Sequence, residues 1–429
     1  MPLTPEQVSL IKATIPVLQE HGTTITTTFY RNMLHAHPEL YSIFNKTNQT
    51  TGQQPAALAN SLLAYATHID DLGALSPAVS LIVNKHASLY VQPDQYEIVG
   101  KFLLEAMQQV LGTALTPDLL EAWKAAYWQL ANVLIGEEAD LYREADGWTD
   151  WRDFTIVDKV PESSEITSFY LKPTATTTAA EDSKLPSFKP GQYIGVQVRV
   201  PALQGQLQAR QYSLSEQPRK DYYRISVRKD EGGASGKFHP GYVSNVLHEN
   251  YGVGDTIRVS HPAGDFFLQP ENEEGDDKPI VLIAAGVGLT PLTSMLNYQV
   301  GQSNNNKKIH FIHGAHSIQS RAFQDHIGKL LLLEKPDFRA TFFTTTGGEI
   351  SLKGKGLEEG KGTGLTQLRG HVDLKQLDAV KDLFVDDPRT EYYVCGPTGF
   401  MSAVKTQLVD GLHVGPERVR MEVFGTGGV

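Results

Sequence analysis

Apolar residues recur at helical spacing through the first third of the chain, and residues 3 to about 143 show no convincing strand alternation. Thr4-Pro5-Glu6-Gln7 supplies an N-cap, a proline at the first helical position and a glutamine in the capping-box position. The Thr-Pro start recurs at Thr116, ahead of a long helix with one apolar face. The pattern predicts an all-α domain, with further helices near residues 24–36, 55–70, 77–90 and 94–111.

From Phe154 onward, short runs alternate apolar and polar residues, with glycine, proline and charged turns between them. These runs indicate β-rich structure, and we expect a small antiparallel barrel. Its predicted strands are Phe154–Val160, Ile166–Leu171, Gln192–Val200, Tyr223–Arg228 and Thr256–Ser260. The segment 174–183 contains few large apolar residues and is expected to be a solvated loop.

From Pro279 the pattern changes again, because apolar runs now alternate with helical segments. This order predicts a parallel sheet with crossover helices, a layout typical of nucleotide-binding domains. The expected strands are Ile280–Ala284, Ile309–His313, Phe338–Phe343 and Tyr392–Cys395. An acidic insert at 271–277 and a Gly- and Lys-rich insert at 347–364 are expected to be flexible surface loops.

The length of 429 residues exceeds what one hydrophobic core usually supports. A hydrophobic content of 40% with 20% charged residues lies in the ordinary globular range, so each domain can bury a core. We therefore expect an all-α domain over residues 1–147, an antiparallel β-barrel over 148–270 and an α/β domain over 271–429.

The net charge of -11 opposes attraction to nucleic acid or to an anionic membrane, so neither is expected as a partner. Cys395 is the single cysteine and cannot form an internal disulfide, which suits a reducing compartment. The N-terminal sequence lacks a signal or transit pattern, and no apolar run is long enough to span a bilayer. We expect a cytoplasmic protein, and a monomer.

A glycine-containing loop follows the first strand of the α/β region. It reads Gly286-Val287-Gly288-Leu289-Thr290-Pro291 and runs into a helix. Glycine backbone at a helix N-terminus can approach a pyrophosphate, so the loop is a candidate dinucleotide site. Pro291 stands where the dinucleotide fingerprint has its third glycine, and a plain strand-to-helix turn explains the loop equally well.

Two further motifs favour the nucleotide interpretation. Arg210-Gln211-Tyr212-Ser213 follows the strand that contains Tyr193, and Cys395-Gly396-Pro397 ends a late strand. In order and spacing these motifs resemble the ferredoxin-reductase-like superfamily, whose barrel binds flavin and whose α/β domain binds nicotinamide. The resemblance implies that Tyr193 and residues 210–213 hold FAD. An Arg fork suits phosphate, and a Tyr ring can stack on isoalloxazine. Taken singly, the tyrosines could be barrel aromatics, Arg210 a surface ion pair and Cys395 a buried thiol.

Two weaker elements extend this resemblance. Gly241-Tyr242-Val243-Ser244-Asn245 matches a family turn whose backbone, at Val243 and Ser244, binds FAD phosphate; here Gly232-Gly233 is separated from it by seven residues, unlike the family. The C-terminal strand ends Glu422-Val423-Phe424-Gly425-Thr426 and resembles the segment that lies against the flavin. The alternative for Glu422 is a solvated terminal carboxylate.

His86 is the candidate metal ligand of the helical region. It shares one helical stripe with Val79, Ile82, Val83 and Leu89, which directs its imidazole into the core. A core histidine that merely forms hydrogen bonds is the common alternative.

The residues around His86 resemble the globin domain of flavohaemoglobins, and the resemblance extends over residues 3–429. The shared residues are, in order, Phe29-Tyr30, Pro38-Glu39-Leu40, Phe44, Gln54, Lys85-His86, Tyr96, Glu138-Ala139 and Tyr142. The resemblance implies haem b, with His86 as the iron ligand and Phe44 on the haem edge. It also places Tyr30 with Gln54 on the distal side, Tyr96 with Glu138 behind the histidine, and Lys85 at the cofactor. Gln53, Glu137 and His68 are the neighbouring alternatives, and Lys85 could be a solvated charge.

Such a fusion is expected to pass electrons from NADH or NADPH through FAD to the haem, where O₂ and NO react to give nitrate. The sequence leaves the choice of nucleotide open. One alternative is an O₂-binding or redox-sensing haem protein with its own reductase. Another is a reductase for an external acceptor, whose helical module binds a partner and holds no haem.

Overall fold

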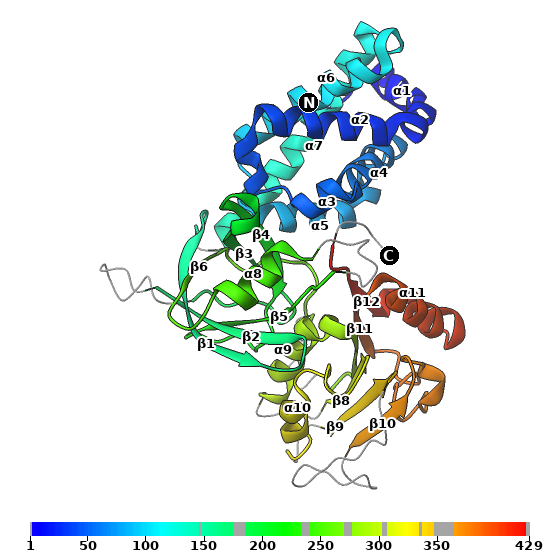
Figure 1. Cartoon of the computed structure of the whole chain (residues 1–429). Helices are drawn as coiled ribbons and strands as arrows, with labels where there is room; N and C mark the ends of the chain where they lie inside the picture. Colours follow the sequence, from blue (N-terminus) through cyan, green and yellow to red (C-terminus); the bar gives the residue numbers. More distant parts are fainter. Residues whose placement is uncertain are drawn as a thin grey trace.

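A computed structural model describes residues 2–145, 147–174, 185–232, 240–269, 277–302, 307–333, 337–346 and 364–425. The chain runs from a helical domain, through an antiparallel sheet, to a parallel α/β domain (Figure 1). The predicted fold class is confirmed. The predicted boundaries at residues 147 and 270 fall between elements, because the last helix of the first domain ends at Glu144 and the α/β sheet begins at Ile280.

The helical domain comprises α1 (Pro5–Ala13), α2 (Ile15–Ala36), α3 (Lys46–Thr50), α4 (Gln53–Thr67), α5 (Ser76–Ala87), α6 (Pro93–Leu111) and α7 (Pro117–Glu144), with the 3-10 turn η1 (Pro38–Ser42). The predicted capping box is present at Thr4. The predicted start of α2 near residue 24 is wrong, because the helix begins at Ile15. Buried Thr26 donates its hydroxyl hydrogen to the carbonyl oxygens of Gly22 and Pro55. Such polar residues on the buried face interrupt the helical spacing of apolar residues.

The antiparallel sheet contains six strands in the order β4-β3-β6-β1-β2-β5. Their bounds are β1 (Arg152–Pro161), β2 (Ile166–Pro173), β3 (Tyr193–Val200), β4 (Gln206–Ser213), β5 (Tyr223–Arg228) and β6 (Thr256–Val259). An isolated antiparallel bridge between Leu214 and Ile225 joins the two edges of the sheet, as in a barrel. We did not predict β4, because its sequence QLQARQYS is mostly polar.

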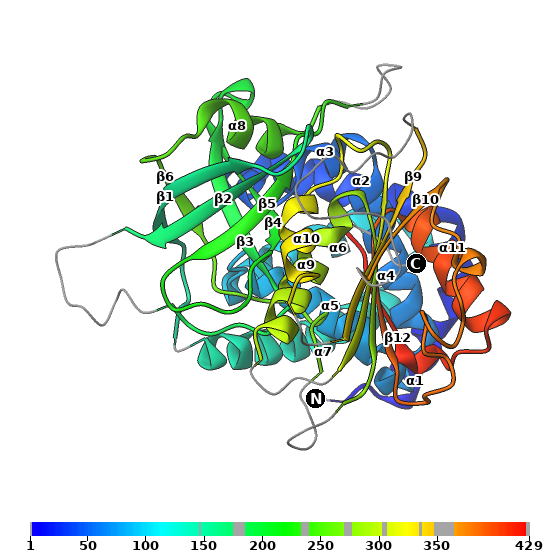
Figure 2. The same ribbon diagram turned by 90° about the horizontal axis from the view of Figure 1, so that it is seen from below.

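The α/β domain has a parallel sheet in the order β10-β9-β8-β7-β11-β12. In Figure 2, α9 and α10 lie on one face of this sheet and α11 lies on the other. The bounds are β7 (Ile280–Ala285), α9 (Leu289–Val300), β8 (Lys308–Ala315), α10 (Gln324–Leu330), β9 (Asp337–Thr344), β10 (Leu365–Arg369), β11 (Glu391–Cys395), α11 (Thr398–Thr406) and β12 (Val419–Glu422). The predicted C-terminal strand stops at Glu422, so residues 423–425 follow it as irregular backbone.

The three predicted surface loops lie almost wholly outside the described residues. Only Thr174, Asp277 and Gly364 of these loops are described. In the described part of the chain, every helix is too short or too polar to cross a bilayer.

Strand β4 docks the barrel on the helical domain. Arg210 donates from Nη2 to Asn45 Oδ1 at 2.6 Å, and Gln208 donates from Nε2 to the carbonyl oxygen of Tyr41 at 2.5 Å. Further along the strand, Gln211 Nε2 donates to Ser88 Oγ at 3.1 Å. The polar side chains that give β4 no apolar alternation are therefore the ones that bond the barrel to the helical domain.

His261 extends the same interface from the barrel side. Its ring packs on the rings of Tyr90 and Tyr142, and its Nδ1 lies 3.1 Å from Tyr90 Oη. Burial lowers the pKa of His261 from 6.5 to about 4. Nothing described bonds to its Nε2.

Acid is expected to weaken this interface. Between pH 6.5 and 4 an unfolded histidine binds a proton that folded His261 does not, so the unfolding free energy falls as the pH falls. The slope is about 1.4 kcal/mol per pH unit for one such group. Urea unfolding across this range should give a shallower pH dependence for His261→Gln. The control, His35→Gln at an exposed site, should keep the wild-type slope. Equal slopes in all three proteins would contradict the prediction.

Candidate active site

The site in the helical domain is built around His86, in the last turn of α5. His86 Nδ1 lies 2.9 Å from Tyr96 Oη, on α6, and 2.9 Å from Glu138 Oε1, on α7. Tyr96 donates its hydroxyl hydrogen to the same Glu138 oxygen at 2.5 Å. Three helices thus place the three predicted side chains in contact.

Burial distinguishes the two candidate glutamates. Glu138 is 2% exposed, whereas Glu137 is exposed. A buried carboxylate that accepts from Nδ1 fixes the imidazole tautomer and increases its basicity. The bonds described for His86 all involve Nδ1, which leaves the Nε2 lone pair for a metal. Burial and the charge of Glu138 raise the pKa of Tyr96, so its hydroxyl stays protonated.

Tyr30 and Gln54 also lie together, as predicted from the resemblance. Gln54 lies close enough to the Tyr30 hydroxyl to lower its pKa, but burial outweighs this effect and raises the pKa of the tyrosine. Phe44 packs edge-on against the Tyr30 ring, with centroids 5.4 Å apart. Gln54 is partly buried, whereas the alternatives Gln53 and His68 are exposed.

The buried apolar residues of the helical domain form two clusters, and the partly buried Tyr127 and Leu130 pack against both. One includes Phe29, Tyr30 and Met33, with Phe44 packed against it. The other includes Val83, Tyr96 and Leu134. A domain of this size usually has one contiguous core. Two clusters, with the Tyr30 pair in one and the His86 network in the other, fit a flat apolar group that completes the core.

The candidate flavin residues meet on β3 and β4, where Tyr193 lies directly opposite Ser213. Tyr193 is buried, and its hydroxyl has no hydrogen-bond partner among the described residues. Arg210 is partly buried and, in the described part of the chain, forms no ion pair with a carboxylate. Burial lowers the pKa of this guanidinium. An orphaned buried hydroxyl and a cation without a counter-charge fit a polar, phosphate-bearing ligand.

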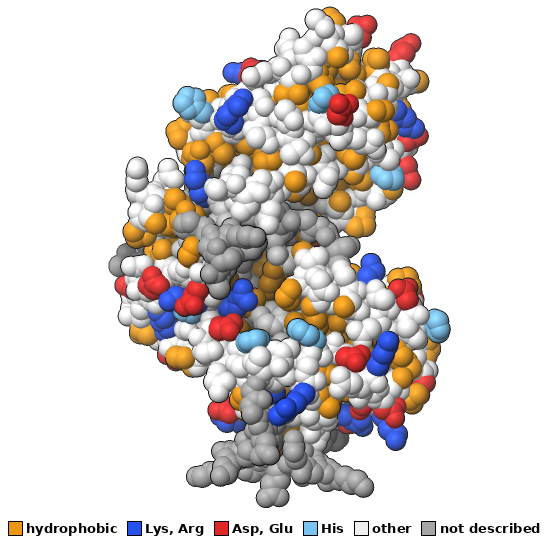
Figure 3. All heavy atoms as spheres, turned by 45° about the vertical axis from the view of Figure 1, so that its right-hand side comes forward, with side chains coloured by type: hydrophobic (Ala, Val, Ile, Leu, Met, Phe, Trp, Pro, Cys, Tyr) orange, Lys and Arg blue, Asp and Glu red, His pale blue; other side chains and the backbone are white. Residues whose placement is uncertain are grey.

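The segment after β12 reaches the helical domain near α5, as the red end of the chain shows in Figure 1. Lys85 Nζ donates to the carbonyl oxygen of Gly425 at 2.6 Å. Glu422 is 8% exposed, so it is not a solvated carboxylate, and burial together with the Asp265 charge raises its pKa to about 7. Phe424 is exposed, and Thr426 lies outside the described residues. Figure 3 shows the surface indented between the helical and α/β domains.

The glycine loop and the Cys-Gly-Pro motif meet at the carboxyl edge of the parallel sheet. Residues 286–288 form a 3-10 turn before α9, and a Cβ on Gly288 would lie 2.2 Å from the carbonyl oxygen of Cys395. Burial raises the pKa of the Cys395 thiol. Gly396 and Pro397 follow directly as the link from β11 to α11.

Several predicted cofactor residues can contribute only backbone. Leu289, Thr290 and Pro291 have buried side chains within α9. The Gly-x-Val-Ser-Asn segment is not a turn but the start of helix α8 (Tyr242–Asn250), because Val243 packs into the barrel core. A helix N-terminus presents backbone N–H groups that have no partner within the helix, which suits an anion such as phosphate. Val287 and Ser244 are partly buried.

Some residues of the two sites could not be found from the sequence. Asn45 bonds to Arg210, Ser88 to Gln211, and Asp265 raises the pKa of Glu422. No local motif marks them, because each acts across a domain interface. They can be identified only from how the three domains pack on one another, which the tertiary structure shows.

Comparison with known proteins identifies the domains and the family of the chain. Residues 27–134 match the globin family, and residues 282–406 match the oxidoreductase NAD-binding domain family. The flavohemoprotein of Bordetella parapertussis is 44% identical, with 100% of both chains covered. The flavohemoglobin of Malassezia yamatoensis, solved with bound FAD and heme, has a TM-score of 0.80 and 28% identity, over 99% of this chain and 100% of that one.

A third similar structure covers the reductase part alone. It is the flavohem-like FAD/NAD-binding domain of nitric oxide dioxygenase from Vibrio cholerae, with 30% identity, a TM-score of 0.50, and coverage of 64% of this chain and 99% of that one. Fold and site together define a globin joined to a flavin reductase. The chain belongs to the flavohemoprotein family.

Proposed function

We propose that the protein is an NADH- or NADPH-dependent nitric oxide dioxygenase that holds haem b and FAD and acts on O₂ and NO. The observation that carries the proposal is the hydrogen-bonded network of His86, Tyr96 and Glu138, placed beside the C-terminal segment of a reductase. A globin that only carries O₂ needs no attached reductase. An attached reductase implies that the haem iron is reduced repeatedly, as in a catalytic cycle. We further propose that it works as a cytoplasmic monomer without nucleic acid or membrane partners.

When bound, the nucleotide supplies a hydride, FAD passes its two electrons on singly, and the haem supplies the iron at which O₂ reacts with NO. His86 would hold the iron through Nε2, while Glu138 accepts from Nδ1 and makes the imidazole a stronger electron donor. Tyr30 and Gln54 would provide the hydrogen bonds of the distal side. Arg210, Tyr193 and Ser213 would hold FAD.

Nitrate formation tests the proposal. The holoenzyme with NADH, O₂ and NO should consume NADH and yield nitrate. Tyr30→Phe should lower this rate by about 100-fold, because it removes one buried donor aimed at developing charge. Tyr65→Phe is the matched control: Tyr65 is a buried tyrosine whose hydroxyl donates to the Ala126 carbonyl oxygen at 2.9 Å.

Nitrate at the uncatalysed level would contradict the proposal. Tight O₂ binding with slow NADH turnover would instead indicate an O₂-binding protein or sensor. Equal nitrate rates for Tyr30→Phe and Tyr65→Phe would refute the role of Tyr30 while leaving the activity in place.

A further inference from the structure

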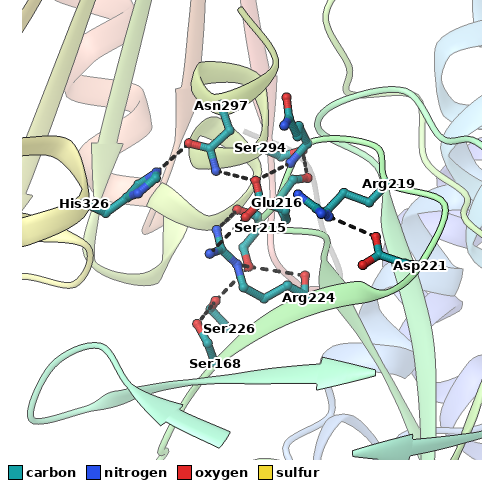
Figure 4. A network of polar contacts seen from close by, with 11 residues as sticks. Ser168, Ser215, Glu216, Arg219, Asp221, Arg224, Ser226, Ser294, Asn297 and His326 are labelled. Carbon is teal, nitrogen blue, oxygen red and sulfur yellow. Dashed lines mark hydrogen bonds and ion pairs between the residues drawn. The ribbon is translucent and has the colours of Figure 1, made fainter. Parts of the chain in front are cut away.

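A buried polar network joins the barrel to the α/β domain, directly after the proposed flavin residues of β4 along the chain (Figure 4). Its barrel side is Glu216, just after β4, and Arg224 on β5. Arg224 Nη1 lies 3.3 Å from Glu216 Oε2, and the two side chains are 6% and 16% exposed. Arg224 also donates from Nε to Ser215 Oγ at 3.1 Å. The barrel therefore presents a fixed carboxylate at its edge.

Helix α9 of the α/β domain binds this residue twice. Asn297 donates from Nδ2 to Glu216 Oε1 at 2.8 Å, and Ser294 donates from Oγ to the carbonyl oxygen of Glu216 at 2.7 Å. His326 of α10 adds a second layer, with Nε2 2.7 Å from Asn297 Oδ1. Glu216, Arg224, Ser294, Asn297 and His326 are called the junction network below.

The arginine also reaches across the junction. Its guanidinium carbon lies 4.9 Å from the ring centroid of Phe323, which precedes α10. Phe323 has a φ of 57°, in the left-handed region that a bulky residue avoids. The surrounding structure thus holds the Phe323 ring against Arg224 although the backbone conformation of Phe323 is unfavourable.

The junction network lies on the short path between the two reductase ligands. Glu216 follows Ser213, the proposed flavin contact, by three residues. At the other side, α9 begins directly after the loop 286–288, the proposed nucleotide contact. Because a helix is stiff, a shift of α9 at Ser294 and Asn297 moves that loop relative to the flavin residues.

We propose that Glu216 is a positioning residue for hydride transfer, which sets the placement of the bound nicotinamide against the flavin by holding α9. The proposal rests on the proposed function, in which a nicotinamide nucleotide reduces FAD. In that step the C4–H bond of the nicotinamide breaks and an N5–H bond forms on the flavin. Both electrons move with the hydrogen, so the nucleotide is oxidised and the flavin reduced. Glu216 acts through α9, and not on the reacting atoms.

The charge of Glu216 is central to this role. In Glu216→Gln the amide oxygen can still accept one hydrogen bond, but the buried guanidinium of Arg224 loses the carboxylate that lies 3.3 Å from it. The charge of the partly buried Glu162, which also acts on Arg224, remains. The network must then rearrange, and α9 with it. A displacement of about 1 Å at a reacting centre can slow a step by about 100-fold.

The test is anaerobic stopped-flow reduction of FAD in the full-length holoenzyme, at increasing NADH and, separately, NADPH. For Glu216→Gln we expect the limiting rate to fall about 10-fold or more, with a smaller change in the half-saturating nucleotide concentration and full flavin content. Dithionite, which needs no nucleotide site, should reduce FAD equally fast in all proteins. The matched control is Asp221→Asn: Asp221 is a neighbouring exposed carboxylate, 3.0 Å from Arg219 (Figure 4).

Asn297→Ala tests the same contact from the other domain and leaves the ion pair of Glu216 and Arg224 intact. It too should lower the limiting rate, and the double variant should lose less than the product of the two effects. If Glu216→Gln does not fold, Asn297→Ala alone decides. An unchanged limiting rate per bound flavin in the folded variant, even with a lower melting temperature, would overturn the proposal.

The outcome separates this proposal from the proposed function. If the wild type reduces its FAD with nucleotide but makes no nitrate, the rate difference between variants still supports the positioning role. If nitrate forms and the variants match the wild type, only the positioning role fails. If neither nucleotide reduces the wild-type flavin, both fail.

Discussion

Replacing His86 with alanine is expected to abolish the Soret band of the purified protein and, with it, nitrate formation. The reason is that His86 is the imidazole whose Nδ1 is held by Glu138 and Tyr96, with Nε2 left free for iron. Loss of this residue removes the side chain that would bind the iron, and with it the main attachment of the haem to the protein. Absorption spectra before and after reduction under CO measure the result. Added imidazole should restore part of the band, because it fills the space left by the side chain.

The reductase provides an internal control for this variant. His86→Ala should keep its flavin spectrum and its NADH-dependent reduction of an artificial acceptor such as ferricyanide. His68→Ala, at the exposed end of α4, should keep the wild-type Soret band. An unchanged band in His86→Ala would show that another residue binds the iron.

Gly288→Ala is expected to disable the nucleotide site. The added Cβ would lie 2.2 Å from the carbonyl oxygen of Cys395 and 2.6 Å from the backbone nitrogen of Gly396. These are backbone atoms in the centre of the sheet and cannot rotate away. We expect a loss of about 3 kcal/mol in the stability of the α/β domain. Flavin reduction by NADH should slow by about 100-fold, because strand and loop must move apart.

Gly286→Ala is the control within the same loop. Gly286 has a φ of 54° and open space around its Cβ position. Alanine there should cost only about 1 kcal/mol for the left-handed backbone. Thermal unfolding compares the two variants, and stopped-flow reduction measures Gly288→Ala alone, because Gly286 itself belongs to the proposed nucleotide contact. Similar losses of stability at the two positions would mean that the clash with Cys395 is not what matters.

The sequence predicts those elements whose burial follows a simple period. Strands buried on both faces, such as β7, and amphipathic helices, such as α6, lie where the pattern places them. Strand β4 was missed because its residues face a neighbouring domain and a proposed cofactor rather than a core. Strand β10 has only partly buried or exposed residues, which gives it no apolar run.

The residues of the candidate site also differ in how far the sequence predicts them. His86, Tyr96 and Glu138 are separated by 10 and 42 residues, and only the family resemblance predicted that they meet. The structure brings them together. Periodicity placed His86 on the apolar stripe of its helix but could not specify its partners: its Nδ1 lies against buried Glu138, while the side chain is 33% exposed. Glu216 carried no signal at all, since a single acidic residue in a turn is indistinguishable from a solvated charge until the neighbouring domain is in place.

The stretch from Gln208 to Glu216 contacts all three domains, because it bonds to Tyr41 and Asn45, lines the proposed flavin site and ends at α9. In a chimera that takes its globin or its nucleotide-binding domain from a relative, the contacts at one end of this stretch would therefore be mismatched. Successful exchange requires transplanting the strand's facing residues together with the module. One stretch of chain thus couples the three domains, even though each has a hydrophobic core.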